Sequence, residues 1–477
     1  MTYGEHEFNH VFDGSALLQK FTFGENGATF SSRFLKSYAY TTNLENEQIV
    51  VSEFGTTGKS LSRSKLGKLG DKLAFDKMFS DNAPVGVVVF GGEHYCTTEA
   101  PFLHKIDPET LETISKVDLH KELGINSQCP NPKMLSDGTS INVLHAVGAT
   151  GPKYDIVAIP KKPVVGKASV FSKPKKIGSV DARWKLNPCH MHTFGLTENY
   201  VVLLEQPLTI DVKATVTNTI FDKPFIGGME WMENKLVKIH LVNRETGKEL
   251  KQKIKCEAFF FMHIINCFEQ DNHVVIDVDT YKKPELLYAF YVKNLRRGSV
   301  LGSELDRGCV KRVVVPLDVP EKVAPETNLV RLAGSKATAR KQKDGSLLLT
   351  PDTFTNCVYE VPTLHPQHAS RKYRYFYGNS GDMTVNAGKV GKVDFDSREV
   401  KEWHEEEVYA NVTCFVPRPG ATAEDDGVLL VTAVHSTDRR KTSLVVLDAA
   451  DMKEMGRVEF MTPSDVPKSL HGLFIPE

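Results

Sequence analysis

Three histidines in similar surroundings are the residues of this sequence best suited to bind a metal. His192 in HMHTFGL, His263 in FFFMHIINCFE and His471 in SLHGLFIPE each lie within or beside apolar, β-like sequence. Any one of them alone is more often a packed side chain than a ligand. Their separations of 71 and 208 residues are about one and three times 70, as expected if separate repeats of a radial fold each point one imidazole toward a common axis. An all-imidazole site suits Fe(II), Zn(II) or Cu(II).

Short β-rich runs must position these histidines. They recur along the chain and are bounded by Gly, Pro, Asp or Asn, as in VGVVVFGG at 85, YVVLLEQPL at 200, HVVIDVDTY at 273 and GVLLVTAV at 427. Such runs are typical of strands, and long helical periodicity is nearly absent. The sequence therefore predicts an all-β fold with a closed or radially repeated sheet.

Four hairpin-like segments form a loose internal repeat. Each has an apolar residue, an Asp or Asn, a polar turn and then a polar strand, and the turn residues are Asp107, Asn243, Asp396 and Asp448. Propeller blades of four strands repeat about every 40 to 50 residues and lengthen with loop insertions. The repeat favours a propeller, and we expect residues 1–477 to form a single propeller domain.

Composition narrows the possible partners. The chain has 477 residues, with 59 Lys and Arg against 60 Asp and Glu, so no overall charge favours nucleic acid. It starts without a signal-peptide pattern and contains no run of the roughly 18 apolar residues that a spanning helix needs. Its eight cysteines form no CxxC pair. We therefore expect a cytoplasmic protein that binds small or apolar ligands.

One basic segment, residues 58–79, departs from the β pattern. Its leucines Leu66, Leu69 and Leu73 recur at helical spacing among six Lys or Arg and two Asp residues. Such a stretch can lie on an anionic membrane surface, which would suit a protein that extracts a lipid-like substrate. The alternative is a solvated helix over the edge of the β structure. Peripheral membrane contact is thus one of two interpretations.

The longer motifs of the chain resemble those of the carotenoid oxygenase family, in particular its animal branch of β-carotene oxygenases and the retinal pigment epithelium isomerohydrolase. The resemblance covers nearly the whole chain and rests on FNHVFDGSALLQKF at 8, VVSEFGT at 50, HKIDPETLETISKVDL at 104, HTFGLTENYVVLLEQPL at 192, HIINCFEQDNHVVIDV at 263, RKYRYFYG at 371, EDDGVLLV at 424 and the terminal LHGLFIPE. It implies a seven-bladed β-propeller with Fe(II) held on the axis by four histidines. A helical and loop cap would enclose an apolar substrate tunnel.

The resemblance also assigns site residues. The second, third and fourth family histidines fall on His192, His263 and His471. Two of the three glutamates that orient those rings fall on Glu99 in CTTEAPF and Glu360 in VYEVP. These assignments imply an Fe(2+) site open to O2.

Three departures from the family pattern affect this site. Asn131 in CPNPKMLSDGT stands where the first histidine is expected, and Val412 stands where the third glutamate is expected. Because residues i and i+2 of a strand share a face, His190 could compensate for Asn131. The relatives also carry a further glycine-rich strand segment ahead of FNHVFDG, so the N-terminal strand segment is expected to be truncated.

Three functions follow from the resemblance. The first is an Fe(II)-dependent dioxygenase that uses O2 to cleave a conjugated double bond of a carotenoid or apocarotenoid to aldehydes. The second is a non-catalytic carotenoid or retinoid binder with a degenerate iron site. The third is a retinyl ester isomerohydrolase, which the sequence TGKSLSR disfavours because it replaces the family loop that carries an acylated cysteine.

Overall fold

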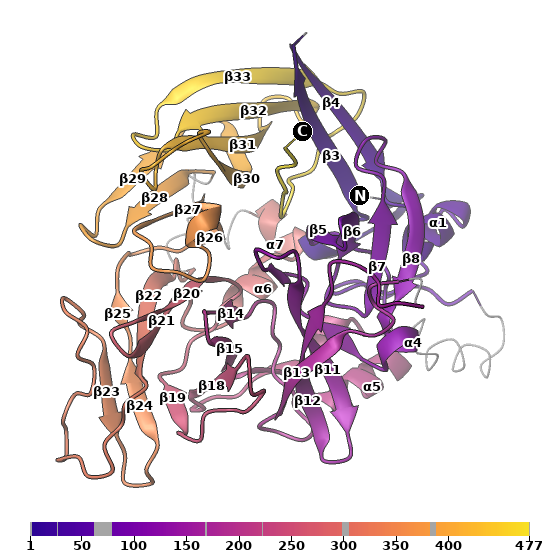
Figure 1. Cartoon of the computed structure of the whole chain (residues 1–477). Helices are drawn as coiled ribbons and strands as arrows, with labels where there is room; N and C mark the ends of the chain where they lie inside the picture. Colours follow the sequence, from indigo (N-terminus) through magenta and orange to yellow (C-terminus); the bar gives the residue numbers. More distant parts are fainter. Residues whose placement is uncertain are drawn as a thin grey trace.

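The sheets of the protein follow one another around a ring. The computed structural model describes residues 2–25, 27–61, 79–166, 169–221, 223–297, 305–381 and 388–476. In Figure 1 the sheets run in chain order around the ring, from purple through magenta and orange to yellow. This arrangement is a β-propeller, as the sequence predicts.

Six sheets of four or more strands make up the ring in the described residues. The first contains β5 (Gly86–Phe90), β6 (Glu93–Thr97), β7 (Phe102–Ile106) and β8 (Thr113–Asp118). The second contains β9 (Ser127–Gln128), β10 (Lys133–Met134), β11 (Ser140–Gly148), β12 (Gly151–Ile159) and β13 (Lys175–Asp181). The third contains β14 (Gly195–Leu196), β15 (Tyr200–Glu205), β18 (Val237–Asn243), β19 (Ile254–Cys256), β24 (Leu347–Thr350) and β23 (Thr338–Lys341).

The remaining three sheets are antiparallel and have four strands each. The fourth contains β20 (Ile264–Gln270), β21 (His273–Thr280), β22 (Cys309–Pro316) and β25 (Asp352–Thr353). The fifth contains β26 (Tyr359–Thr363), β27 (Tyr375–Ser380), β28 (Val390–Asp394) and β29 (Val400–Trp403). The sixth contains β30 (Val408–Pro417), β31 (Gly427–His435), β32 (Lys441–Asp448) and β33 (Glu454–Met461).

The number of blades differs from the expected seven. Between the sixth sheet and the first lies only the antiparallel hairpin of β3 (Leu17–Gly24) and β4 (Gly27–Phe34) (Figure 1). Phe21 and Phe30 of this hairpin pack against Phe460 of β33, and Arg33 pairs with Glu112 beside β8. Two strands do not make a four-stranded blade. The prediction of seven blades is therefore wrong for the described residues, which form a six-bladed propeller with a hairpin in the remaining position.

The hydrophobic core lies between neighbouring sheets. Val143 and Ile156 of the second sheet pack with Leu203 of the third, and Val202 of the third packs in a cluster with Val278 of the fourth. Further clusters join the first sheet to the second, the fourth to the fifth and the fifth to the sixth. Apolar side chains thus hold each sheet against the next around the ring.

The turn repeat predicted from the sequence is present, with one correction. In four sheets the turn between the third and fourth strands closes through a side-chain oxygen that accepts backbone N–H groups two and three residues further on. Asp107, Asn243 and Asp448 do this as expected. In the fifth sheet the acceptor is Asp394 and not Asp396. VDFDSRE contains two aspartates, and the first of them ends β28 and so is placed to accept.

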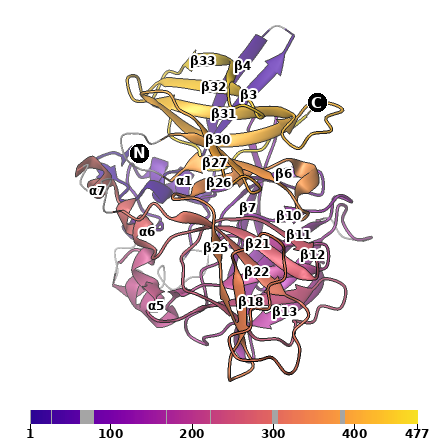
Figure 2. The same cartoon turned by 90° about the vertical axis from the view of Figure 1, so that its left-hand side faces the viewer.

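Short helices and loops cover one side of the ring. Figure 2 shows α1 (Tyr38–Glu45), α5 (Val212–Ile220), α6 (Glu285–Ala289) and α7 (Val292–Arg297) on that side. The other short elements are α4 (Leu119–Leu123), β1 (Thr2–Tyr3), β2 (His6–Glu7), β16 (Leu208–Ile210), β17 (Met229–Trp231) and the 3-10 turns Val11–Asp13, Phe225–Gly228 and Pro366–His368.

No helix of the described residues is both long and apolar enough to cross a bilayer. The basic segment 58–79 lies mostly outside the described residues, which exclude 62–78. The membrane contact predicted for it, and the cytoplasmic location, therefore stay predictions.

Candidate metal centre

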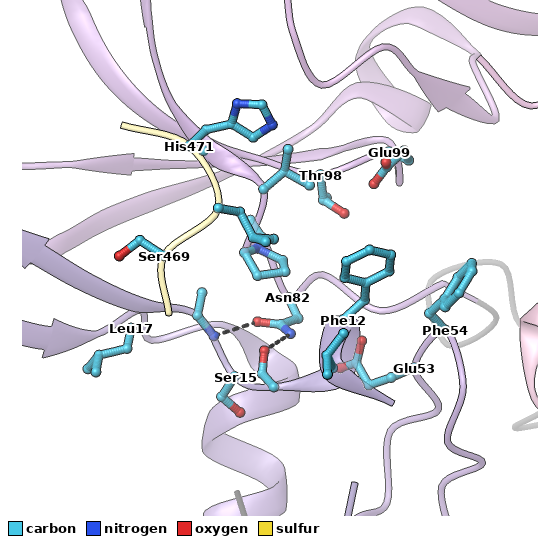
Figure 3. Close-up of a pocket in the computed structure, with 18 of the residues that line it drawn as sticks. Phe12, Ser15, Leu17, Glu53, Phe54, Asn82, Thr98, Glu99, Ser469 and His471 are labelled. Carbon is cyan, nitrogen blue, oxygen red and sulfur yellow. Dashed lines mark hydrogen bonds between the residues drawn. The ribbon is translucent and has the colours of Figure 1, made fainter. Parts of the chain in front are cut away.

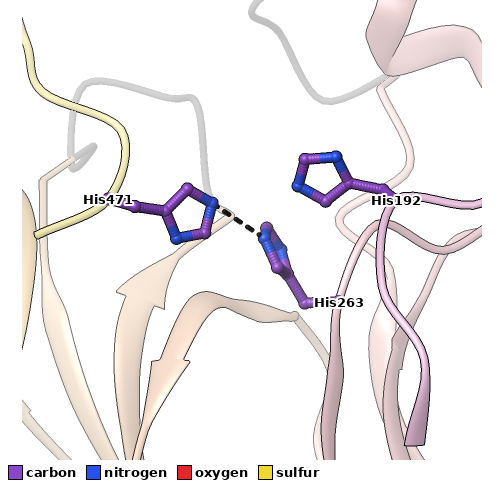
Figure 4. Close-up of side chains that lie close together, drawn as sticks. All are labelled: His192, His263 and His471. Carbon is purple, nitrogen blue, oxygen red and sulfur yellow. Dashed lines mark hydrogen bonds between the residues drawn. The ribbon is translucent and has the colours of Figure 1, made fainter. Parts of the chain in front are cut away.

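Three histidines from distant parts of the chain converge on the axis. His192 lies shortly before β14, His263 directly precedes β20, and His471 lies in the tail after β33. Each offers a ring nitrogen, and these nitrogens lie within 4.8 Å of one another. Figure 4 shows the three rings pointing toward a common centre. The cluster that the sequence spacing predicts is therefore formed.

Bulges at inner strands help to aim the side chains of this centre. The first strands of the fourth, fifth and sixth sheets each carry a register shift, at Ile264/Asn266 in β20, Glu360/Thr363 in β26 and Ala410/Thr413 in β30. A bulge bends the strand and redirects neighbouring side chains. The shifts thus lie beside His263, at Glu360 and around Val412, which are the positions that the family resemblance singles out.

Two of the three rings are held by carboxylates. His192 Nδ1 lies 2.6 Å from Glu99 Oε1, and His263 Nδ1 lies 2.5 Å from Glu360 Oε2. The Tyr281 hydroxyl donates to the second oxygen of Glu360 at 2.9 Å. With its Nδ1–H donated to a carboxylate, each ring presents the lone pair of Nε2 to the centre. Both glutamates therefore occupy the orienting role that the resemblance implies.

Thr193 joins the first two histidine segments. Its hydroxyl donates to the Met262 carbonyl at 2.9 Å and accepts from the Ile264 N–H at 3.0 Å. These contacts flank His263 on both sides. Because Thr193 directly follows His192, the same residue fixes the relative placement of both ligands.

His471 is positioned by packing instead. A Cβ on Gly86 of β5 would lie 2.9 Å from His471 Cβ, and a Cβ on Gly472 would lie 2.6 Å from Val412 Cγ1. The tail therefore passes between the first and sixth sheets at a distance that only glycine allows at these two positions. Val412 is 4% exposed, and no carboxylate of the described residues hydrogen-bonds His471.

Burial favours the neutral form of two imidazoles of the centre. It lowers the pKa of His263, an effect that Glu360 partly opposes, and lowers the pKa of His471 much further. Burial raises the pKa of Glu99, but the His192 hydrogen bond and the nearby charges outweigh it and lower this pKa to about 2. Two imidazoles whose neutral form is favoured, together with an anionic carboxylate behind His192, are suited to a divalent cation.

The nitrogen spacing fits such a cation. His263 Nε2 and His471 Nε2 lie 3.3 Å apart. Imidazole nitrogens bind a first-row ion at about 2.1 Å, so two of them at right angles would be about 3 Å apart. Because His263 Nδ1 hydrogen-bonds Glu360, the lone pair of His263 Nε2 faces the His471 ring. A cation between the two rings would bind both Nε2 atoms.

Asn131, which replaces the first family histidine, lies beside the cluster, whereas His190 is not part of it. Asn131 Nδ2 lies 3.1 Å from His192 Nε2, so this side chain adjoins the cluster, as expected for a fourth position. In the orientation seen, its amide donates to the nitrogen that would bind metal; turning the amide would present its oxygen. His190 is not a member of the three-histidine group, and its role as a compensating ligand stays a prediction.

A large cavity of about 2600 Å³ reaches the centre. His192, His263 and His471 line it together with Glu99 and Glu360. Figure 3 shows that it extends from His471, Thr98 and Glu99 toward Phe12 and Phe54, with the tail residue Ser469 alongside. The Phe12 ring packs against the rings of Phe54 and Phe290. A long apolar ligand can therefore enter this space.

One acid in this cavity has a raised pKa. Glu53 accepts a hydrogen bond from Ser80 at 2.7 Å. Burial and the nearby charges of Asp13 and Asp81 raise its pKa well above the usual range. Burial therefore favours the protonated, uncharged form of this acid.

Sequence reasoning missed several residues that shape the site. No motif with recognised chemistry contains the residues that support the histidines. These are Tyr281, which donates to Glu360, Thr193, which joins two histidine segments, and Gly86, which leaves room for His471. The alternating acids of VIDVDTY, inside an otherwise apolar strand, were a signal for buried polar contacts near Tyr281. Phe12 and Phe54 stand in motifs that carry the resemblance, yet nothing in their spacing identifies them as cavity residues.

Known proteins match the chain over its full length. The family model described as retinal pigment epithelial membrane protein matches residues 1–476. A carotenoid isomerooxygenase of Galleria mellonella is 34% identical over 99% of this chain and 88% of its own length. A beta,beta-carotene 15,15'-dioxygenase of Gallus gallus is 33% identical over 100% of this chain and 91% of its own.

Solved structures agree on the fold. A variant of the Synechocystis apocarotenoid oxygenase superposes with a TM-score of 0.74 at 20% identity, over 98% of this chain and 89% of that one. The sequence matches above, each over nearly the whole chain, place it in the family that its motifs resemble. The protein belongs to the carotenoid oxygenase family, which includes the retinal pigment epithelial membrane protein.

Proposed function

We propose that this protein is an Fe(II)-dependent dioxygenase that cleaves a conjugated double bond of a carotenoid or apocarotenoid to aldehydes. The observation that carries the proposal is the opening of a three-histidine centre into a long, aromatic-lined cavity. Relatives named as a carotenoid isomerooxygenase and a carotene dioxygenase support the same reaction class. The partners are the polyene and O2, with no role for nucleic acid.

Each residue of the centre has a separate task in this proposal. His192, His263 and His471 would hold the iron, and bound Fe(II) would supply the site at which O2 is activated. Glu99 and Glu360 keep two rings in the tautomer that leaves Nε2 free. Asn131 adjoins the position of a fourth ligand. Phe12 and Phe54 exclude water from the polyene and orient it by apolar contact.

A cleavage assay tests the proposal. Protein loaded anaerobically with Fe(II) is given β-carotene or an apocarotenoid and then exposed to air, and products are separated by chromatography. We expect aldehydes that require both iron and air. Absence of aldehydes with several polyenes, from protein that contains one iron per chain, would contradict the proposal.

A second candidate is a non-catalytic carotenoid or retinoid binder that keeps the cavity but binds iron weakly. The observation in its favour is the pair of replacements at Asn131 and Val412, which removes one imidazole and one orienting carboxylate. Loss of such an outer partner typically weakens metal affinity or activity 10- to 100-fold. This candidate predicts pigment retained through purification and much less than one iron per chain by elemental analysis.

A further inference from the structure

Two histidines of the cavity have ring nitrogens that nothing in the described residues satisfies. His145 Nε2 and His190 Nδ1 are both closed to solvent and have no hydrogen-bond partner there. Native proteins rarely leave buried polar atoms unpaired, and such atoms often indicate an absent water, ion or ligand. Neither residue is part of the three-histidine group.

The two histidines lie on segments that share a tyrosine at the cavity wall. His145 lies on β11 and His190 lies between β13 and β14, and both line the cavity. The Tyr154 hydroxyl accepts from the backbone N–H of Cys189, the residue before His190, at 2.9 Å, and the Tyr154 ring lies 5.2 Å from the His145 ring, so one tyrosine contacts both histidine segments. The backbone N–H of His190 donates to the Leu208 carbonyl at 2.9 Å, so its segment is fixed.

His145 is anchored on its other side. Its Nδ1 lies 3.0 Å from Ser127 Oγ, and its ring meets the Tyr154 ring edge-on at 5.2 Å. These contacts hold the ring in place while its Nε2 stays unpaired. Ser127 also lines the cavity, which makes this a polar group of three side chains within a largely apolar space.

The chemistry of the group favours a neutral oxygen. Burial lowers the pKa of His145 to about 4, so this imidazole is uncharged at neutral pH and attracts no anion. A neutral imidazole has one N–H donor and one nitrogen acceptor. A hydroxyl can both donate to and accept from such a group, and a carbonyl can accept from it.

We propose that His145 and His190 form a polar subsite that binds the hydroxyl or carbonyl oxygen at one end of an oxygenated polyene. This inference rests on the proposed function, because it assumes that the cavity holds a polyene. The subsite would select polyenes with oxygenated ends over polyenes with hydrocarbon ends. Sites built to hydrogen-bond a ligand oxygen discriminate against analogues that lack it.

Binding to iron-free protein under nitrogen tests the subsite without any turnover. The probes are β-carotene, its 3,3′-dihydroxy derivative zeaxanthin and its 4,4′-diketo derivative canthaxanthin, and quenching of tryptophan fluorescence measures affinity. We expect the wild type to bind at least one oxygenated probe about 10-fold more tightly than β-carotene, as one or two net hydrogen bonds allow. A preference for zeaxanthin or for canthaxanthin tells a hydroxyl from a carbonyl.

Matched variants assign the preference to the two rings. His190→Phe and His145→Phe should each bring the affinity ratio close to one, and His190→Gln, which keeps a donor and an acceptor, should restore part of it. His94→Phe is the control, since His94 also lines the cavity but on β6, and it should keep the ratio. Circular dichroism confirms folding of each variant.

The outcomes separate this inference from the proposed function. Equal wild-type affinity for all three probes would mean that water alone satisfies the rings, and would overturn the subsite while leaving the function standing. Loss of the ratio in His94→Phe as well would also overturn it. Failure of the wild type to bind any probe would contradict the proposed function itself.

Discussion

The two sides of the metal centre are built differently. On one side His192 and His263 are each tied to a glutamate and are joined through Thr193. On the other side His471 comes from the chain's tail and packs against Gly86, with Val412 where the third glutamate of the family is expected. The first side is therefore organised by hydrogen bonds within the protein, whereas the second is held by packing. The predictions below test this difference.

Removing a ligand from the organised side should have the largest effect. In His263→Ala the remaining rings cannot enclose the ion, so iron affinity should fall by more than the roughly 100-fold that loss of an outer partner can cause. Isothermal titration with Fe(II) under nitrogen measures this. His94→Ala serves as the control and should bind iron as the wild type does. Unchanged iron binding in His263→Ala would show that the ion lies elsewhere.

Removing the carboxylate behind that ligand should have an intermediate effect. Glu360→Gln keeps the volume but loses the charge that accepts from His263 Nδ1, so iron affinity should drop roughly 10- to 100-fold. Glu402→Gln is a matched control, because Glu402 lies on β29 outside the cavity lining and accepts from the hydroxyl of Tyr359. Equal losses in the two variants would indicate a general change in stability and not the loss of an orienting contact.

Adding a carboxylate to the other side should make the two sides more alike. Val412→Glu places an acid beside the His471 segment, and we expect iron to dissociate up to about 10-fold more slowly if this acid accepts from His471. In iron-free protein the same buried charge should lower the melting temperature. Faster iron loss would contradict the view that a missing carboxylate weakens this side.

Acid should also distinguish the two sides in iron-free protein. The pKa of His263 is lowered by burial but supported by Glu360, whereas burial and the neighbouring histidines lower that of His471 further. As pH falls below 6.5, His263 should therefore take up a proton before His471 does, which ring ¹⁵N NMR can follow. At these two histidines the unfolded chain binds more protons than the folded one, so their contribution to the free energy of unfolding should decrease with falling pH.

The smallest effect on iron is expected at His190. If His190 compensated for Asn131, His190→Phe would lose iron. Its position outside the three-histidine group predicts unchanged iron content by elemental analysis. A substoichiometric result in folded His190→Phe, with full occupancy in the wild type, would make His190 a ligand.

Much of this arrangement could be predicted from the sequence. Alternating apolar runs and Asx turns identify a radial β fold, because each sheet needs the same strand period and the same turn chemistry. The intervals between His192, His263 and His471 indicate their convergence. The number of blades could not be obtained this way, because it depends on whether β3 and β4 acquire further partners across the ring.

The residues that hold the ligands were harder to find. Glu99 and Glu360 follow from the resemblance alone, since a glutamate beside a strand has no distinguishing local pattern. Thr193 and Gly86 act through contacts between segments that are about 70 and 385 residues from their partners, and such distances carry no local signal. The unpaired nitrogens of His145 and His190 depend on how β11 packs beside the segment before β14, and the sequence carries no local signal for this packing.

Crystals grown with Fe(II) under nitrogen would test the central claim most directly, through an anomalous difference map recorded at the iron absorption edge. The account predicts one strong peak per chain, within bonding distance of ring nitrogens of His192, His263 and His471. A map without a peak there, or with its strongest peak at other residues, would contradict it.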